Sequence, residues 1–352
     1  MDKELSTPPP STLSVRDLCV SFGSGTRSTQ VLHGIDLSIQ PGEIHGLVGE
    51  SGSGKTLLAL SMLGLLPQGA QRQGAVALGE TVLSDLSERK LRAIRGARIS
   101  MVFQEPMTAL NPVKTIGDQI ADAIEVRSAT KPSLHERGRT RDTVIALLSS
   151  VRIEDPARCA SSFPHMISGG ERQRAMIAMA IANQPDIIIA DEPTTALDVT
   201  VQAEILDLLV ELVERRGMGM LFISHDLAVV GEIADRVSVL YAGRVVETGP
   251  VHKVLGDAKH PYTQGLMASS LIPQEMNGTG GERGVDTGRI KRPPLPVIPG
   301  TVPSPKALPN GCAFSPRCAE KDPRCGTVPD LLGPDGADVS DGWQVACWRR
   351  AT

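Results

Sequence analysis

The segment from position 49 to position 56 has the composition of a loop that binds phosphates. Glycines let backbone N–H groups turn towards one anion without Cβ clashes, and the N-terminus of a following helix adds partial positive charge. Lys55 would reach the β- and γ-phosphates, and Thr56 would offer its hydroxyl to Mg²⁺. We therefore predict a nucleoside triphosphate site. The segment fits the Walker A spacing G-x-x-x-x-G-K-[ST] and consists of Gly49, Glu50, Ser51, Gly52, Ser53, Gly54, Lys55 and Thr56.

The residues that flank this segment favour the same interpretation. The apolar run 44–48 predicts a β-strand, and the pattern LLALSMLGLL predicts a helix that begins near Lys55. An ordinary loop rich in glycine and serine is the alternative, but such a loop requires neither element beside it. A strand before and a helix after are the context that phosphate binding needs.

A second group that could take part in this chemistry ends the apolar segment DIIIAD at positions 186–191. The segment is short and rich in β-branched residues, which predicts a buried strand. Asp191 would hold Mg²⁺ directly or through water, and Glu192 would polarise the attacking water as a general base. The alternatives are a capping role for Asp191 and a solvated Glu192. The run DEPTTALD, which starts at Asp191, favours the catalytic interpretation.

The segment SGGE is another candidate anion site. Ser168, Gly169, Gly170 and Glu171 stand at the start of a predicted helix over 168–183, whose N-terminus would attract an anion. Simple helix capping is the alternative. With this segment the chain carries two anion sites but one phosphate loop. A dimer explains both, because the segment of one chain would cover the γ-phosphate bound to another.

Two further polar residues follow predicted strands. His225 comes after MLFIS, at the C-terminal end of a strand, where ligands bind in α/β proteins. We expect it to contact the γ-phosphate and to help orient the water. Gln104 ends the predicted strand ISMVFQ and would bind Mg²⁺ or water while linking the site to the next helical segment. Taken singly, each residue is also typical of an exposed position.

Length and composition fit a globular protein with a sizeable core, since 41% of the 352 residues are hydrophobic. The formal net charge of −4 gives no support for a nucleic-acid-binding surface. The sequence has no uncharged apolar run of about 18 residues that would cross a bilayer. The N-terminus lacks the features of a secretory signal, so we expect a cytoplasmic protein. Alternating strands and helices predict a mainly parallel, layered α/β core.

Together these motifs resemble those of the ATP-binding-cassette (ABC) ATPase family, over about residues 13–272. SGGE is similar to the family's LSGGQ signature, and Gln104 to its Q-loop glutamine. TALD, which ends in Asp198, is similar to the D-loop, and ISHD contains His225 as the switch histidine. Phe22 stands where the family places an aromatic residue that stacks on adenine, although core packing is equally compatible with it.

The resemblance implies a P-loop ABC ATPase core with a mainly parallel sheet, an antiparallel β subdomain and an α-helical subdomain at about 105–185. It implies ATP and Mg²⁺ as ligands, and a head-to-tail dimer. Two departures concern the signature: Ile167 stands for the usual leucine, and Glu171 for the usual glutamine. The second puts a carboxylate near the phosphates.

Two classes of protein remain open for this cassette. One is the energising subunit of a membrane transporter, and the other is a soluble ABC ATPase that acts on ribosomes or DNA. Soluble members commonly have two cassettes or a long coiled coil, whereas this chain has one cassette and no sustained heptads. The segments 103–120, 260–270 and 294–318 resemble the ATPases of oligopeptide/dipeptide importers.

The importer resemblance implies several partners and no nucleic acid. These are two transmembrane permease subunits, an extracytoplasmic substrate-binding protein and a second, distinct ATPase that would form a heterodimer with this chain. The region near 105–125 would dock a coupling helix of a permease. The protein would lie on the cytoplasmic face of the membrane as a peripheral subunit. The resemblance implies import of dipeptides or oligopeptides, and the nickel chelates, glutathione or sugars that related systems carry are the alternatives.

Composition divides the chain into four segments. We expect a disordered leader at 1–12, the nucleotide-binding domain at 13–272, a glycine-rich charged linker at 273–292, and a proline-rich terminal module at 293–352.

The terminal module contains four cysteines with the spacing C-x5-C-x6-C-x21-C. Clustered thiols in a reducing compartment more often bind metal than form disulfides. The resemblance implies a 4Fe–4S cluster, and structural zinc is the alternative, although the paired C-x2-C of common zinc modules is missing. An unligated tail is less compatible with a small module that has few apolar residues. The four ligands would be Cys312, Cys318, Cys325 and Cys347.

Overall fold

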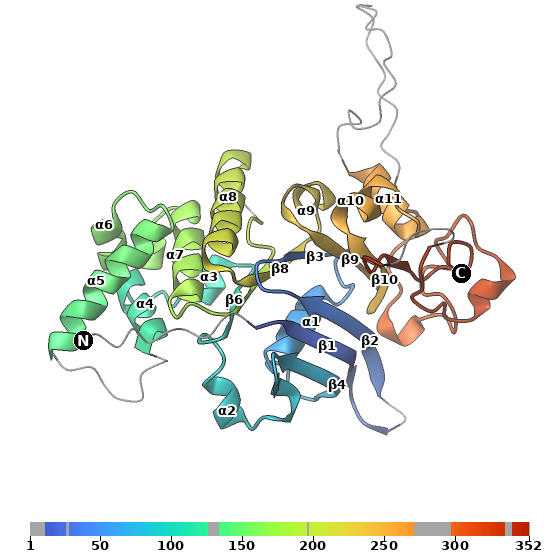
Figure 1. The fold of residues 1–352 in the computed structure, drawn as a ribbon, viewed down its shortest axis with the longest axis horizontal. Helices are drawn as coiled ribbons and strands as arrows, with labels where there is room; N and C mark the ends of the chain where they lie inside the picture. The colour runs from blue at the N-terminus through green and yellow to red at the C-terminus, as the bar shows by residue number, and fades with distance from the viewer. Residues whose placement is uncertain are drawn as a thin grey trace, which may run out of the picture.

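The structure of the chain is a computed structural model that describes residues 11–25, 28–125, 134–195, 197–270, 297–334 and 340–351. Most of the expected leader and all of the expected linker lie outside these ranges. Figure 1 shows three groups of elements along the long axis: a helical group, a central pair of sheets, and the C-terminal segment.

A seven-stranded sheet with the order β11-β10-β9-β3-β8-β7-β6 forms the centre of the molecule. The strands from β9 to β6 run parallel, and β10 and β11 are antiparallel additions at one edge. The parallel strands β3, β7 and β8 are buried at every position, which explains their continuous apolar sequences. The strands are β3 (Ile44–Val48), β6 (Ile99–Val102), β7 (Ile187–Asp191), β8 (Gly219–Ser224), β9 (Arg236–Tyr241), β10 (Arg244–Pro250) and β11 (Gln344–Val345).

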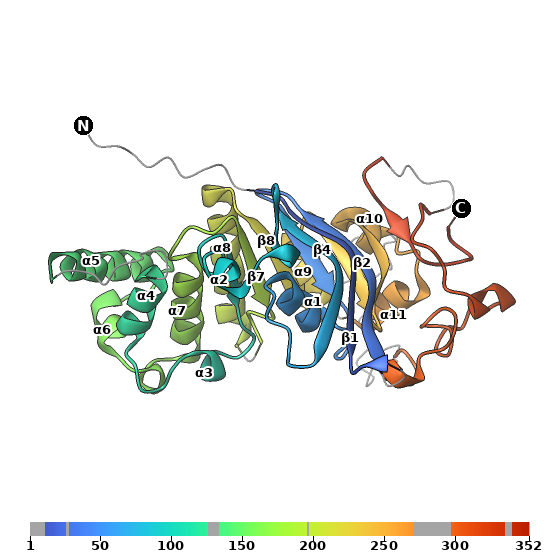
Figure 2. The same cartoon turned by 90° about the horizontal axis from the view of Figure 1, so that it is seen from below.

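A four-stranded antiparallel sheet with the order β2-β1-β4-β5 covers one side of the central sheet. Figure 2 shows helix α1 between the two sheets. Leu58 and Met62 of α1 share one hydrophobic core with Leu47 of β3 and with the inner residues of the antiparallel sheet. The elements are β1 (Leu13–Phe22), β2 (Thr29–Ile39), β4 (Ala70–Leu78), β5 (Thr81–Val82) and α1 (Lys55–Met62).

The other side of the central sheet packs against helices, and the helical group extends from its β6 edge (Figure 1). Short 3₁₀ turns lie at Leu83–Asp85 and Pro164–Met166. The helices are α2 (Glu88–Arg92), α3 (Pro106–Ala109), α4 (Ile116–Glu125), α5 (Leu134–Ser150), α6 (Pro156–Ser161), α7 (Gly169–Ile181), α8 (Val199–Arg216), α9 (Leu227–Ile233), α10 (Val251–Gly256) and α11 (Pro261–Ser269).

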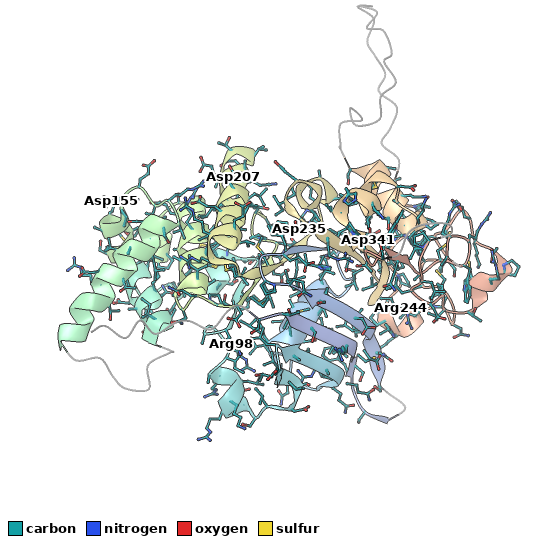
Figure 3. All side chains as sticks on the ribbon, viewed as in Figure 1. Arg98, Asp155, Asp207, Asp235, Arg244 and Asp341 are labelled. Carbon is teal, nitrogen blue, oxygen red and sulfur yellow. The ribbon has the colours of Figure 1, made fainter. Side chains whose placement is uncertain are left out.

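The C-terminal segment packs onto the core beside the central sheet. Strand β11 pairs with β10, and Phe314 and Trp343 belong to the hydrophobic core on the helical side of this sheet. Lys253 of α10 forms an ion pair of 2.7 Å with Asp341, which Figure 3 labels. Two 3₁₀ turns, η5 (Pro305–Ala307) and η6 (Pro323–Gly326), are its other regular elements among the described residues.

The predicted fold class is confirmed, and several bounds differ from expectation. The strand at 44–48 and the helix that begins at Lys55 are found as predicted. Strand β6 ends at Val102, two residues before Gln104, which was expected to end this strand, and the short helix α3 follows at Pro106–Ala109. Helix α5 begins at Leu134, within the polar stretch of the sequence at 128–140, whose composition alone is typical of a loop. Leucine, glutamate and arginine are good helix formers, so a polar stretch alone does not end a helix.

Candidate nucleotide-binding site

The phosphate loop connects β3 to α1 through backbone that glycine alone adopts easily. Gly54, which precedes α1, has a φ of 107°, and a Cβ there would lie 2.7 Å from Leu32 Cδ2. At Gly49, where φ is 157°, a Cβ would lie 2.2 Å from the Leu240 carbonyl oxygen. Both glycines are therefore required by the close packing of the loop on β2 and β9.

Lys55 lies across the phosphate loop. Its Nζ donates hydrogen bonds to the Gly49 carbonyl at 2.7 Å and to the Glu50 carbonyl at 3.1 Å, and the residue is 6% exposed. Burial lowers the pKa of Lys55, and the nearby carboxylates of Glu192, Asp191 and Glu50 oppose that shift. The ammonium is thus held inside the loop, where it would form ion pairs with the phosphates of a bound nucleotide.

Asp191 ends β7 beside the start of α1. It is 2% exposed, and its Oδ1 has no hydrogen-bond partner within the described part of the chain. Burial raises the pKa of this carboxyl, while a hydrogen bond from Thr56 lowers it. A buried carboxylate oxygen without a partner, next to a threonine hydroxyl, is a donor set that suits Mg²⁺. Ser53 Oγ is likewise buried, with no partner among the described residues, which leaves it available to a ligand of the loop.

The Glu192 carboxylate is the point where the three predicted catalytic residues meet. Gln104 Nε2 donates to Glu192 Oε2 at 2.9 Å, and His225 Nδ1 lies 3.4 Å from the same oxygen. Glu192 has a left-handed φ of 46°, an uncommon conformation for a residue with a side chain. Its backbone N–H donates to the Ile223 carbonyl at 3.0 Å, which anchors this turn to β8.

One contact at this carboxylate is absent from the predictions made on the sequence. Thr195 Oγ1 donates to Glu192 Oε2 at 3.0 Å. The threonine follows Glu192 by three positions, so the spacing of a side chain that reaches back across a turn could have indicated it. The Glu192 side chain is 15% exposed and that of His225 is 64% exposed, so the group opens to solvent through the histidine.

The SGGE segment begins α7 with a capping box. Ser168 Oγ accepts from the Glu171 N–H at 3.2 Å, and Glu171 Oε2 accepts from the Ser168 N–H at 2.9 Å. Glu171 also pairs with Arg158, so its charge is partly neutralised. The SGGE segment therefore caps α7, which was the alternative to an anion site. Ile167, the departure from the usual leucine, is 4% exposed and packs in the core.

The D-loop aspartate and the SGGE segment lie on the same side of the fold. Asp198 caps α8 by accepting from the Val201 N–H at 3.0 Å, and a Cβ on Gly170 would lie 3.0 Å from Val201 Cγ1. Gly169 in turn faces Leu197, 3.7 Å from where its Cβ would be. These contacts join SGGE to the start of α8. The hydrogen bonds described for Ser168 and Glu171 do not reach the phosphate loop.

Phe22 ends β1, where it pairs with Thr29 of β2 and Ala70 of β4. The ring is half-buried and packs against the core beneath the antiparallel sheet. The geometry is compatible with both expectations for this residue, core packing and contact with a base.

The four C-terminal cysteines come together in the fold. Cys312, Cys318, Cys325 and Cys347 line one cavity of about 20 Å³. Burial raises the pKa of Cys312 to about 11 and also raises those of Cys318 and Cys347. Within the described ranges, however, no three His, Cys, Asp or Glu side chains are arranged to hold a metal ion. The expectation of zinc or an iron–sulfur cluster therefore has no direct support in this geometry.

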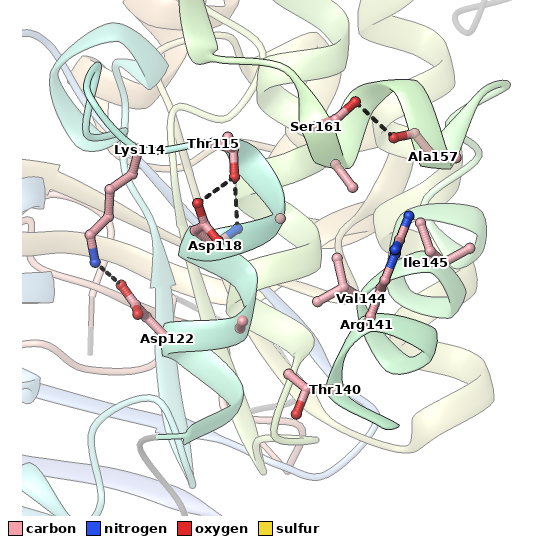
Figure 4. Close-up of a pocket in the computed structure, with 13 residues that line it drawn as sticks. Lys114, Thr115, Asp118, Asp122, Thr140, Arg141, Val144, Ile145, Ala157 and Ser161 are labelled. Atoms are coloured by element: carbon pink, nitrogen blue, oxygen red, sulfur yellow. Dashed lines mark hydrogen bonds and ion pairs between the residues drawn. The ribbon is translucent and has the colours of Figure 1, made fainter. Parts of the chain in front are cut away.

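A cavity of about 730 Å³ lies apart from the phosphate loop, between α4, α5 and α6 (Figure 4). Lys114 and Asp122 form an ion pair of 2.6 Å at its edge, and Thr115 bonds Asp118 within the first turn of α4. None of the site residues predicted from the sequence lines this cavity.

Comparison with known proteins assigns the chain to a family. The profile described as ABC transporter matches residues 32–195, and the profile described as Oligopeptide/dipeptide transporter, C-terminal region, matches residues 246–285 and 284–325. The Probable peptide ABC transporter ATP-binding protein y4tR of Sinorhizobium fredii is 43% identical over 96% of this chain and 94% of its own length.

The chain belongs to the ABC transporter family.

Other ABC transporter proteins are similarly close. The Probable D,D-dipeptide transport ATP-binding protein DdpD of Escherichia coli K12 is 43% identical over 96% of both chains. The Oligopeptide transport ATP-binding protein OppD of Mycobacterium bovis is 46% identical over 96% of this chain but 52% of its own length. The chain thus spans about half the length of that relative.

Solved ABC cassettes share the fold. The dimeric cassette MJ0796 bound to ADP and Pi aligns with a TM-score of 0.59 and 29% identity, over 68% of this chain and 98% of that one.

None of the helices in the described ranges has both the length and the apolar composition that a membrane span requires.

Proposed function

We propose that this chain is the ATP-hydrolysing subunit of an importer for dipeptides or oligopeptides. The observation that carries the proposal is the meeting of Gln104 and His225 at the Glu192 carboxylate, beside the loop that holds Lys55. The names of the relatives, which refer to peptide, dipeptide and oligopeptide transport, support the cargo class and disfavour a soluble ATPase of ribosomes or DNA.

The reaction is in-line attack of water on the γ-phosphate. Glu192 accepts the proton of the attacking water, while Gln104 and His225 orient the carboxylate and the water. Lys55 and the loop N–H groups neutralise charge on the phosphates, and Mg²⁺ held by Thr56 and Asp191 would supply further charge neutralisation. Phe22 stacks on the adenine in this proposal.

The ATP site is completed by a second ATPase subunit, which we propose to be a distinct protein that forms a heterodimer with this chain. The SGGE segment and Asp198 lie together near the start of α8, and no hydrogen bond described for Ser168 or Glu171 reaches the loop that binds ATP. Both features suit a surface that is presented to another chain. The solved MJ0796 cassette, which shares this fold, is a dimer of cassettes.

We propose that the complex contains two permease subunits at the cytoplasmic face of the membrane and a substrate-binding protein on the other side, and that the region near 105–125, with an apolar groove beside it, contacts a permease. A cavity of about 260 Å³ is lined by residues that include Leu65, Met101 and Phe103. Phe103 is 43% exposed, and Met107 on α3 is 58% exposed. Exposed large apolar side chains beside the Q-loop glutamine suit contact with a helix of a membrane subunit.

We propose that these roles divide the chain into four segments: a leader at 1–12, the nucleotide-binding domain at 13–272 with its helical subdomain at about 105–185, a linker at 273–292, and the cysteine module at 293–352.

In this proposal the four cysteines that line one cavity would ligate a 4Fe–4S cluster, which would stabilise a module that has few apolar residues. Anaerobically purified protein should contain iron and sulfide; stoichiometric zinc without them would instead support the zinc alternative.

The decisive experiment is reconstitution of this chain with its permeases, second ATPase and binding protein in vesicles. MgATP hydrolysis and uptake of labelled peptides should both occur, and both should be lost in Lys55→Ala because the loop loses its buried ammonium. Absence of hydrolysis in the intact complex would overturn the catalytic assignment. Hydrolysis stimulated by ribosomes or DNA, and not by peptide-loaded binding protein, would favour the soluble ATPase.

A further inference from the structure

An arginine of the cysteine module contacts the phosphate loop. Arg317 Nη1 donates to both carboxylate oxygens of Glu50, at 3.1 Å each, although the two residues are 267 positions apart. Glu50 is the second residue of the phosphate loop, and Arg317 lies in the turn bounded by Cys312 and Cys318. The Arg317 side chain is 6% exposed, which distinguishes this pair from an ordinary surface ion pair.

The guanidinium of Arg317 is fixed from several directions. Its Nε donates to the Pro299 carbonyl at 2.8 Å, and Nη2 donates to the Ile298 carbonyl at 3.3 Å. Nη1 also lies 3.4 Å from the Tyr241 hydroxyl, and the ring of Phe314 lies 6.0 Å from the guanidinium carbon. The charge is therefore already in place before any ligand binds, so little side-chain entropy is lost when it acts on Glu50.

A second contact holds the backbone of the same loop residue. The Glu50 N–H donates to the Tyr262 hydroxyl at 2.8 Å, and Tyr262 is fully buried against Tyr241 and Phe314. The Glu50 carbonyl accepts from Lys55 Nζ at 3.1 Å. Glu50 thus connects Arg317 and the aromatic cluster on one side to the phosphate-binding lysine on the other.

A carboxylate in a phosphate loop needs compensation. An uncompensated Glu50 would repel the anionic ligand and compete with it for the Lys55 ammonium, because its charge already partly opposes the lowering of the Lys55 pKa by burial. Arg317 provides an opposite charge within hydrogen-bond distance and holds the carboxylate on the module side of the loop.

We propose that Arg317 is a positioning residue for nucleotide binding, which couples the cysteine-bounded turn 312–318 to the phosphate loop through Glu50. This inference rests on the proposed function, because it assumes that the loop binds MgATP. Any change that displaces the turn 312–318, including oxidation or metal binding of its cysteines, then weakens nucleotide binding at the phosphate loop.

The test uses the full chain in the assembled complex and compares Arg317→Ala with the wild type. We expect the Kd for MgATP to rise roughly 5- to 20-fold, the size of a typical coupling between sites. The KM should rise in parallel, while kcat stays within about twofold because Arg317 does not contact the Glu192 group. Arg317→Lys, which keeps the charge but loses the planar fork, should recover part of the affinity.

Arg324→Ala is the matched control. Arg324 also precedes a cysteine of the module, but it is 59% exposed and pairs with Asp322 of its own turn at 2.8 Å. We expect its replacement to leave MgATP binding unchanged. Thermal unfolding of each variant shows whether the module stays folded.

A double-mutant cycle separates the Glu50 contact from a general structural role of Arg317. In a Glu50→Ala background, Arg317→Ala should change the Kd by less than about twofold, because the carboxylate to be compensated is gone. Equal losses in both backgrounds, or wild-type affinity in Arg317→Ala, would overturn the inference. If the wild-type complex itself neither binds nor hydrolyses MgATP, the proposed function fails instead.

Discussion

The Gln104 amide and the Glu192 carboxylate are joined by a hydrogen bond of 2.9 Å, although 88 positions separate them in the sequence. They meet because β6 and β7 are parallel neighbours, so the residues that follow the two strands leave the sheet at the same edge. His225 follows β8, the next strand in the sheet, and reaches the same carboxylate oxygen.

Replacement of Glu192 by glutamine should separate nucleotide binding from hydrolysis. Glutamine keeps the size of the side chain and an oxygen acceptor for Gln104 and Thr195, but it cannot take a proton from water. We expect MgATP affinity to stay near the wild-type value and kcat to fall by roughly 10²- to 10⁴-fold, measured as phosphate release. Glu232→Gln, an exposed glutamate on α9, is the control. A variant at Glu192 that turns over normally would show that another group is the base.

Replacement of Asp191 by asparagine should shift the Mg²⁺ dependence. The charged oxygen that suits the metal is lost, so we expect roughly tenfold more Mg²⁺ to be needed for half-maximal hydrolysis. Because burial raises the pKa of Asp191, the fold disfavours its charged form, and the metal-free variant should be at least as stable to urea as the wild type.

Asp186→Asn is the control for the metal experiment, because we expect it to affect stability and not Mg²⁺ binding. Asp186 precedes β7, is 6% exposed and pairs with Arg98. Its replacement should reduce the free energy of unfolding without changing the Mg²⁺ requirement. An Asp191→Asn variant with the wild-type Mg²⁺ dependence would remove this residue from the proposed metal site.

Phe103 should contribute to contact with the membrane subunits and not to ATP binding. Its ring is 43% exposed in an apolar groove, and exposed aromatic residues often dominate the binding energy of an interface. We expect Phe103→Ser to keep the Kd for MgATP and to lower peptide uptake by the reconstituted complex roughly tenfold. Val82→Ser, at an equally exposed apolar position on β5, should leave uptake unchanged. Equal uptake by both variants would place the permease contact elsewhere.

His33 should make the stability of the protein depend on pH. Burial, and to a smaller extent the charge of Arg244, lower the pKa of His33 to about 4 from an ordinary 6.5. Between pH 6.5 and about pH 4, His33 is therefore protonated in the unfolded chain and neutral in the folded chain. The free energy of unfolding is unaffected by His33 above pH 6.5 and decreases as the pH falls from 6.5 towards 4.

The measurement for His33 is the free energy of unfolding in urea at neutral and at mildly acidic pH. After allowance for partial exposure, we expect His33→Gln to abolish roughly 1–2 kcal/mol of the loss on going to about pH 5. The exposed His252 on α10 provides the control variant, His252→Gln, which should retain the wild-type slope. An unchanged slope in His33→Gln would show that this ring takes no part.

The amino-acid sequence by itself determined the local parts of this protein. The phosphate loop, its preceding strand and the helix that begins at Lys55 are specified by residues within one short segment, and the structure has them at the predicted positions. The same holds for the α7 cap, in which Ser168 and Glu171 are three positions apart. Glycine conformation, helix capping and apolar periodicity depend on residues that are close together in the sequence, so they can be predicted from the sequence alone.

Only the tertiary structure decided which distant residues meet. The contacts of Glu192 with Gln104 and His225 depend on the order of three strands, which follows from packing the whole sheet. The contact between Glu50 and Arg317 had no sequence signal at all, because 267 positions separate the two and neither residue belongs to a periodic pattern. Contacts of this kind are selected by close packing and charge pairing in the folded chain, which no local segment specifies.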